Sequence, residues 1–180
     1  MAKFYNKLTP RLQKFIENQK IFFVATAAED GRINLSPKGM DSFKVVGENR
    51  LLWLNVTGSG NETAAHLLAK NRITIMFCSF EGAPNILRLY GKGKEIKPSD
   101  SNWEEVAQYF TILPGTRQIF DIELETAQTS CGMSIPFFEY KGEREELNEW
   151  AAGKGEEGIR EYWTEKNQTS IDGLPTNILD

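Results

Sequence analysis

The chain has 180 residues, of which 40% are hydrophobic and 26% charged, and its formal net charge is −4. This is the composition of an ordinary globular domain, long enough to bury a core without disulfides or a structural metal. The negative charge argues against nucleic-acid binding, because neutralising phosphates requires a basic surface.

Metal binding and membrane insertion find no support in the sequence. The two cysteines, Cys78 and Cys131, are far apart, and His66 is the single histidine, so the ligand spacing of a zinc site is missing. The first residues, MAKFYNKLTP, contain no apolar run of the signal-peptide type, and no segment is long and apolar enough to cross a bilayer. We therefore expect a cytoplasmic protein without a metal and with reduced thiols.

The first part of the chain reads as one helix followed by short strands joined by tight turns. Thr9-Pro10 predicts a helix start, because Thr is a good N-cap and Pro suits the first helical turn. Asp30-Gly31 lies between two strand-like runs and predicts a hairpin. The strands expected in this part are residues 21–28, 32–37, 43–46 and 50–56.

Further strands and helices follow, and the last fifty residues differ in character. We expect strands over 72–80, 86–96 and 117–128, and helices over 62–70, from Ser99 or Asp100 to Phe110, over 143–152 and over 156–166. Few connections are long enough for parallel crossovers. The pattern predicts a mainly β fold, an antiparallel sheet of six or more strands closed or nearly closed into a barrel, with peripheral helices.

The most informative segment is Thr57-Gly58-Ser59-Gly60-Asn61, a turn between a strand and a helix. Glycines let backbone N–H groups converge, and a helix N-terminus adds partial positive charge, so this arrangement suits an anion. Side chains of Thr57, Ser59 and Asn61 can add hydrogen bonds. Taken alone, the segment is equally consistent with a helix that Ser59 or Asn61 caps after a flexible turn.

Other candidate residues are each open to a functional and a structural interpretation. Lys38, near Ser36 at the end of the run RINLSPKG, can meet a phosphate or a ring edge, or can simply be solvated. Arg88, within ILRLYGKGKEI, faces either solvent or a partner. His66 is a base, a haem ligand or, more often for a lone histidine, a packed residue. Cys131 is reactive only with a lowered pKa, and a buried inert cysteine is commoner.

The order RINLSPKG, LLWLNVTGSGNETAAHL, RITIMFCSF and ILRLYGKGKEI, over about residues 10–130, resembles the FMN-binding split barrels of the pyridoxamine 5'-phosphate oxidase superfamily. A Ser-Cys-Gly at 130–132 and the tail NQTSIDGLP resemble an uncharacterised subgroup of that family. The resemblance implies an FMN-binding split-barrel domain over residues 1–130 and a C-terminal helical extension over 131–180, packed on the same domain. It also implies a homodimer with FMN at the interface.

The resemblance further implies which residues bind the cofactor. Arg32, Lys38, Ser59 and Asn61 would lie near the phosphate and ribityl chain, and Ser36, Pro37 and Trp53 to Asn55 along the ring. The full predicted set is Arg32, Ser36, Pro37, Lys38, Trp53, Leu54, Asn55, Thr57, Gly58, Ser59, Gly60, Asn61 and Arg88.

Two departures from the oxidase bear on activity. The oxidase has basic residues after its Gly-Ser turn, where this chain has Asn61-Glu62, and an arginine in its tail, where this chain has Asp172-Gly173. We therefore expect an FMN-dependent oxidoreductase that takes electrons from a reduced nicotinamide or small reductant and does not oxidise pyridoxamine 5'-phosphate efficiently. The alternative is a protein that binds flavin or haem for storage or sensing, with His66 as a haem ligand.

Overall fold

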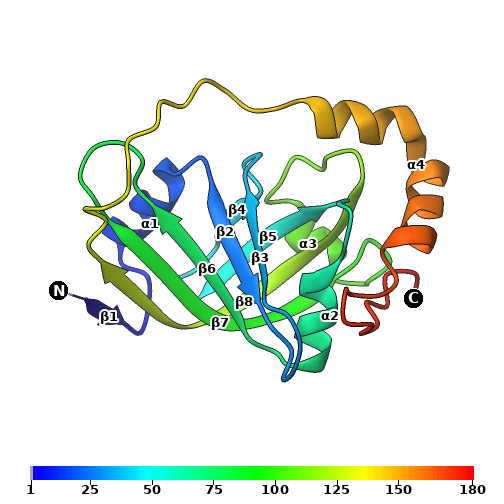
Figure 1. The fold of residues 1–180 in the computed structure, drawn as a ribbon, viewed down its shortest axis with the longest axis horizontal. Coiled ribbons are helices and arrows are strands. Elements are labelled where there is room, and N and C mark those ends of the chain that lie inside the picture. Colours follow the sequence, from blue (N-terminus) through cyan, green and yellow to red (C-terminus); the bar gives the residue numbers. More distant parts are fainter. Residues whose placement is uncertain (1) are drawn as a thin grey trace.

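A computed structural model describes residues 2–180, and its centre is an eight-stranded antiparallel sheet curled into a half-barrel, with four helices around it (Figure 1). The strands are β1 (Lys3–Tyr5), β2 (Phe22–Thr26), β3 (Asn34–Lys38), β4 (Phe43–Val45), β5 (Arg50–Val56), β6 (Ile73–Cys78), β7 (Ile86–Ile96) and β8 (Thr116–Ser130). The helices are α1 (Pro10–Asn18), α2 (Glu62–Ala69), α3 (Trp103–Ala107) and α4 (Glu146–Lys166). The predicted antiparallel split barrel is confirmed.

The strand order is β3-β2-β6-β7-β8-β5-β4, with β1 added to β8. The long strands β7 and β8 pair from Ile86↔Ser130 to Ile96↔Ile119 and form the centre of the sheet. Strand β6 lies between β2 and β7, as its strongly apolar sequence predicts for a strand that is not an exposed edge. Strand β3 is an edge, so its inward and outward faces alternate between half-buried and exposed residues.

Two apolar clusters lie on opposite faces of β5. On the inner face, Trp53 stacks on Phe120 and packs edge-on against Phe22, in the cluster that also holds the helix α1. On the outer face, Leu52 and Leu54 pack against residues of α3 and the loop after it. Because both faces are covered, β5 reads as an almost continuous apolar run, and its position along the sheet is fixed on both sides.

Local signals set most boundaries. Thr9 caps α1 by accepting a bond from the N–H of Leu12, and Pro10 occupies the first turn, as predicted. Helix α3 is shorter than expected and begins after Asn102, because the Asp100 carboxylate accepts a bond from the N–H of Lys97 and closes a turn there instead of capping the helix. The two expected C-terminal helices form α4 with one break at Gly155, whose φ is +63°.

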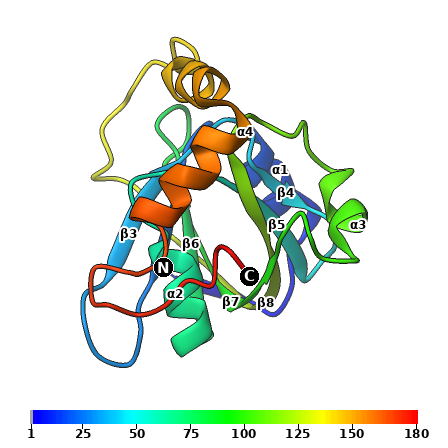
Figure 2. The same cartoon turned by 90° about the vertical axis from the view of Figure 1, so that its right-hand side faces the viewer.

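The segment after β8 passes over the top of the sheet as an irregular loop before α4 begins (Figure 1). Seen from the side, α4 and the C-terminal tail lie together across one side of the half-barrel, near β3, α2 and β5 (Figure 2). Among residues 2–180, no helix has the length and apolar character needed to cross a membrane. The division at residue 130 stays a prediction.

Candidate functional site

A cavity of about 800 Å³ opens between β3, β5, the turn before α2 and the C-terminal tail. This volume lies in the range of pockets that hold cofactors and drug-sized ligands. All predicted site residues except Arg88 line it; the others on its wall include Asn34, Met40, Glu62, Leu113, Arg117, Leu147, Lys166, Ser170 and Ile171. The structure therefore brings the predicted site residues, apart from Arg88, together around one cavity. Their role in cofactor binding stays a prediction.

The turn Thr57–Asn61 is fixed at its base. The N–H and hydroxyl of Thr57 both donate to the Gly115 carbonyl, at 2.8 and 2.7 Å. Asn61 occupies the N-cap position of α2, but its side chain does not cap; it accepts a bond from Gln118 Nε2 at 2.8 Å. Among the described residues, nothing accepts a bond from the N–H of Ser59 or Asn61. These donors at a helix N-terminus are free for an anion.

Two cationic side chains, Lys38 and Arg117, line the same cavity. Burial, and then the charge of Arg117, lowers the pKa of Lys38 to about 8. Burial lowers the pKa of Arg117 to about 10, partly offset by Glu95. Within residues 2–180, neither cation forms an ion pair with a carboxylate. Arg117 is buried and Lys38 is half-buried. Charges withdrawn from water without a counter-ion are costly, so the site suits an anionic ligand.

The side of the cavity away from α2 combines an apolar base with a few polar groups. Trp53 is only 1% exposed, and its ring lies beneath Lys38, whose Nζ is 5.6 Å from the ring centroid. Asn55 is also buried and lines the cavity, yet no described residue bonds to its carboxamide. Ser36, on the inward face of β3, is half-buried. Such a surface suits a planar polar ring.

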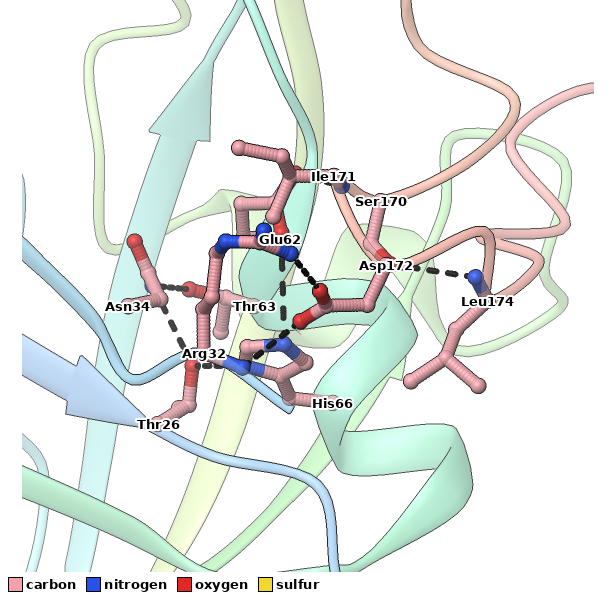
Figure 3. A network of polar contacts seen from close by, with 10 residues as sticks. All are labelled: Thr26, Arg32, Asn34, Glu62, Thr63, His66, Ser170, Ile171, Asp172 and Leu174. Atoms are coloured by element: carbon pink, nitrogen blue, oxygen red, sulfur yellow. Dashed lines mark hydrogen bonds and ion pairs between the residues drawn. The ribbon is translucent and has the colours of Figure 1, made fainter. Parts of the chain in front are cut away.

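Arg32 lines the cavity but is bound to the tail. Its backbone N–H donates to Asp172 Oδ2 at 2.7 Å, and its guanidinium pairs with Asp172 Oδ1 (Figure 3). Next to this pair, the N–H of Ile171 donates to Glu62 Oε1 at 3.0 Å. Both contacts fasten the tail to the β2–β3 loop and to the start of α2. The Arg32 charge is therefore already paired, unlike those of Lys38 and Arg117.

Three candidates lie outside the cavity. Arg88 donates to Ser130 Oγ at 3.0 Å, which matches the paired interpretation. His66 is 1% exposed, and its Nδ1 lies 3.1 Å from Thr26 Oγ1 while Nε2 lies 3.9 Å from Glu62 (Figure 3). His66 is thus a packed residue that joins α2 to β2, and not a ligand facing the cavity. Cys131 is exposed, so the expectation of a buried thiol is wrong.

Sequence reasoning missed Arg117 and the wall supplied by α4 and the tail. Arg117 and Gln118 are adjacent and both buried, which the alternation rule for strands does not allow for. Trp163 in α4 donates from Nε1 to Thr57 Oγ1 at 2.8 Å, and Asn167 contacts both Arg117 and Gly58. The signal that was available is that Arg117 is the one basic residue of β8, whose other charged residues, Asp121, Glu123 and Glu125, are all acidic.

Comparison with known proteins agrees with this arrangement. The family model for pyridoxamine 5'-phosphate oxidase matches residues 8–131. A pyridoxamine 5'-phosphate oxidase family protein, ustO of Aspergillus flavus, is 32% identical over 195 aligned residues, covering 97% of this chain and 78% of the relative.

Two solved structures share the fold at low identity. A variant of HupZ from Group A Streptococcus has a TM-score of 0.55 at 19% identity, covering 68% of this chain and 98% of HupZ. An FAD-binding protein from Mycobacterium smegmatis has a TM-score of 0.50 at 13% identity, covering 69% of this chain and 96% of that protein. Sequence and fold thus agree, and the chain belongs to the pyridoxamine 5'-phosphate oxidase family.

Proposed function

We propose that the chain binds FMN in this cavity and acts as a flavin-dependent oxidoreductase. One observation carries the proposal: two cations without carboxylate partners, Lys38 and Arg117, line the same cavity as the free N–H groups of Ser59 and Asn61. A phosphate bound by these N–H groups gains charge-assisted hydrogen bonds from them, and the positive charges of Lys38 and Arg117 on the same wall favour it further. The family, and the FAD-binding protein of similar fold, support a flavin as the molecule that carries the phosphate.

The other residues of the cavity fit the remainder of the molecule. Trp53 gives an apolar base, and the Asn55 carboxamide and Ser36 hydroxyl supply hydrogen bonds at the ring edge. Bound FMN would supply hydride transfer between a reduced nicotinamide or small reductant and an acceptor. The chain itself would orient the ring and exclude water.

We further propose that pyridoxamine 5'-phosphate is a poor substrate. A phosphorylated substrate needs an anion site of its own, separate from the one that holds the FMN phosphate. Arg32 is the further arginine on the cavity wall, and Asp172 neutralises it. Lys166 is paired with Glu165, and Glu62 adds a carboxylate to the wall. Each lost charge-assisted contact costs about 1.5–3 kcal/mol, so selection for a second phosphate is weak.

Fluorescence titration with FMN and with riboflavin, which lacks the phosphate, tests the binding proposal. We expect Lys38→Met to weaken the binding of FMN about 5- to 30-fold, the equivalent of about 1–2 kcal/mol, and to leave the binding of riboflavin nearly unchanged. Ser59→Asp should weaken FMN more strongly, because it sets charge against charge at the turn. Equal affinity of the wild-type protein for FMN and riboflavin would contradict the assignment of the phosphate site.

An assay of the FMN-loaded protein tests the activity. We expect consumption of a reduced nicotinamide above the rate of free FMN, and no pyridoxal 5'-phosphate above background. Formation of pyridoxal 5'-phosphate at about 0.1 per second or faster, a rate typical of enzymes, would overturn the substrate proposal. A haem Soret band in place of flavin absorption in the purified protein would refute the proposal that the cofactor is FMN. Flavin binding without turnover would leave a storage or sensing protein.

A further inference from the structure

Asn167 lies directly after α4, outside residues 8–131 that match the family model, and every polar group it has is used. It is 0% exposed. Its N–H donates to Trp163 O at 2.9 Å, and its carbonyl accepts from Thr176 Oγ1 at 2.5 Å. Its side chain reaches across the cavity wall, where Oδ1 accepts from Arg117 Nη1 at 2.9 Å and Nδ2 donates to Gly58 O at 3.1 Å.

These contacts fix the orientation of the peptide groups in the turn Thr57–Asn61. The Gly58 carbonyl is held by Asn167, and the Gly60 carbonyl by Arg117 Nη1 at 2.9 Å. The chain has no cis peptide among its described residues, and in a trans peptide the carbonyl and the next N–H point in opposite directions. The N–H groups of Ser59 and Asn61 are therefore turned away from Asn167 and Arg117.

We infer that Asn167 is the positioning residue of the phosphate end of the cavity, because its carboxamide fixes the Arg117 guanidinium and the peptide planes of the turn at the same time. The inference rests on the proposed FMN function. Ending a helix requires only backbone groups, whereas this side chain joins segments 50 and 109 residues away. A turn whose peptide planes are fixed before binding loses less entropy when its N–H groups bind an anion, which raises affinity for a phosphate in particular.

The variant Asn167→Ala removes both side-chain contacts, and Asn167→Leu removes them while keeping a side chain of similar size and no charge. Gln168→Ala is the matched control, since this neighbour is exposed and its Nε2 bonds only to Thr164 O. The measurement is the ratio of the dissociation constants for riboflavin and FMN, taken by fluorescence titration. A general loss of structure weakens both ligands, whereas loss of positioning changes the ratio.

We expect the preference for FMN over riboflavin to fall about tenfold or more in Asn167→Ala and Asn167→Leu, with riboflavin affinity changed less than about twofold and Gln168→Ala like the wild type. Parallel weakening of both ligands, or an unchanged ratio, in variants whose circular dichroism matches the wild type would overturn the inference. If Asn167→Ala does not fold, Asn167→Leu decides. A wild-type protein without preference for FMN would instead refute the proposed function.

Discussion

At the scale of single residues, the proposed phosphate end of the cavity depends on two positive charges that repel each other, one on buried Arg117 and one on half-buried Lys38. Lys38 lies over Trp53 and near Arg117, and burial lowers its pKa to about 8. A bound phosphate would favour the charged form and raise this pKa again. Ligand binding and the protonation of Lys38 are therefore linked.

This linkage predicts how FMN affinity depends on pH. Below about pH 8, Lys38 is charged before FMN binds. Above that pH, Lys38 is mostly neutral and must take up a proton when FMN binds. The affinity for FMN should therefore fall as the pH rises from 8 to 9, by at most about tenfold per pH unit. Lys38→Arg should keep its affinity over this range, because arginine stays charged. Fluorescence titration at pH 7, 8 and 9 measures the effect, and an identical decline in Lys38→Arg would assign it to another group.

Single residues also show the limits of prediction from sequence. The glycines of Thr57–Asn61 and the helix after them indicated an anion site, because the signal is local. Arg117 and Asn167 were not predicted, because both act through contacts with residues about 50 positions away or more. The sequence predicted Arg32 as a phosphate ligand but did not predict its ion pair with Asp172, because the two residues lie 140 positions apart.

At the scale of elements, strand boundaries followed the sequence closely where turn residues bracket apolar runs, as for β5 and β7. The predicted length of helix α3 was too great, because polar residues before it form a turn that helix propensity alone does not reveal. The long pairing of β7 with β8 contains a bulge at Tyr90/Gly91, where the backbone of β8 approaches closely.

The close approach predicts a specific role for Gly91. A Cβ at this position would lie 2.2 Å from the Glu123 carbonyl oxygen, which is backbone and cannot move aside easily. Gly91→Ala should lower the free energy of unfolding by about 2 kcal/mol or more. Gly153→Ala is the control: nothing lies within 4 Å of the added methyl, and alanine in a helix should stabilise by about 0.5–1 kcal/mol. Urea denaturation measures both, and a neutral Gly91→Ala would show that the bulge can relax.

At the scale of the whole molecule, three exposed apolar side chains lie at the rim of the cavity: Ile33 and Leu35 on or next to the edge strand β3, and Ile171 in the tail. They are 76%, 65% and 69% exposed. An open cavity with an apolar rim is what a subunit interface would cover, in line with the homodimer that family resemblance implies.

We therefore predict a homodimer with the cofactor at the interface. Light scattering at micromolar concentration should give twice the chain mass of 20.4 kDa. Leu35→Lys should shift the population to monomers by placing a charge in the interface, which is expected to bury more than about 2,000 Å². Ile112→Lys, an exposed residue that does not line the cavity, is the control. A wild-type monomer in the presence of FMN would refute the prediction.

The fastening of the tail also has a consequence for how the protein is made. The contacts that close the cavity join residues 106 to 140 positions apart. Because translation proceeds from the N-terminus, the strands up to Ser130 leave the ribosome before Trp163 and Asp172 do. The sheet can therefore pair while one wall of its pocket is still missing, and ligand binding belongs to the period after the tail has emerged.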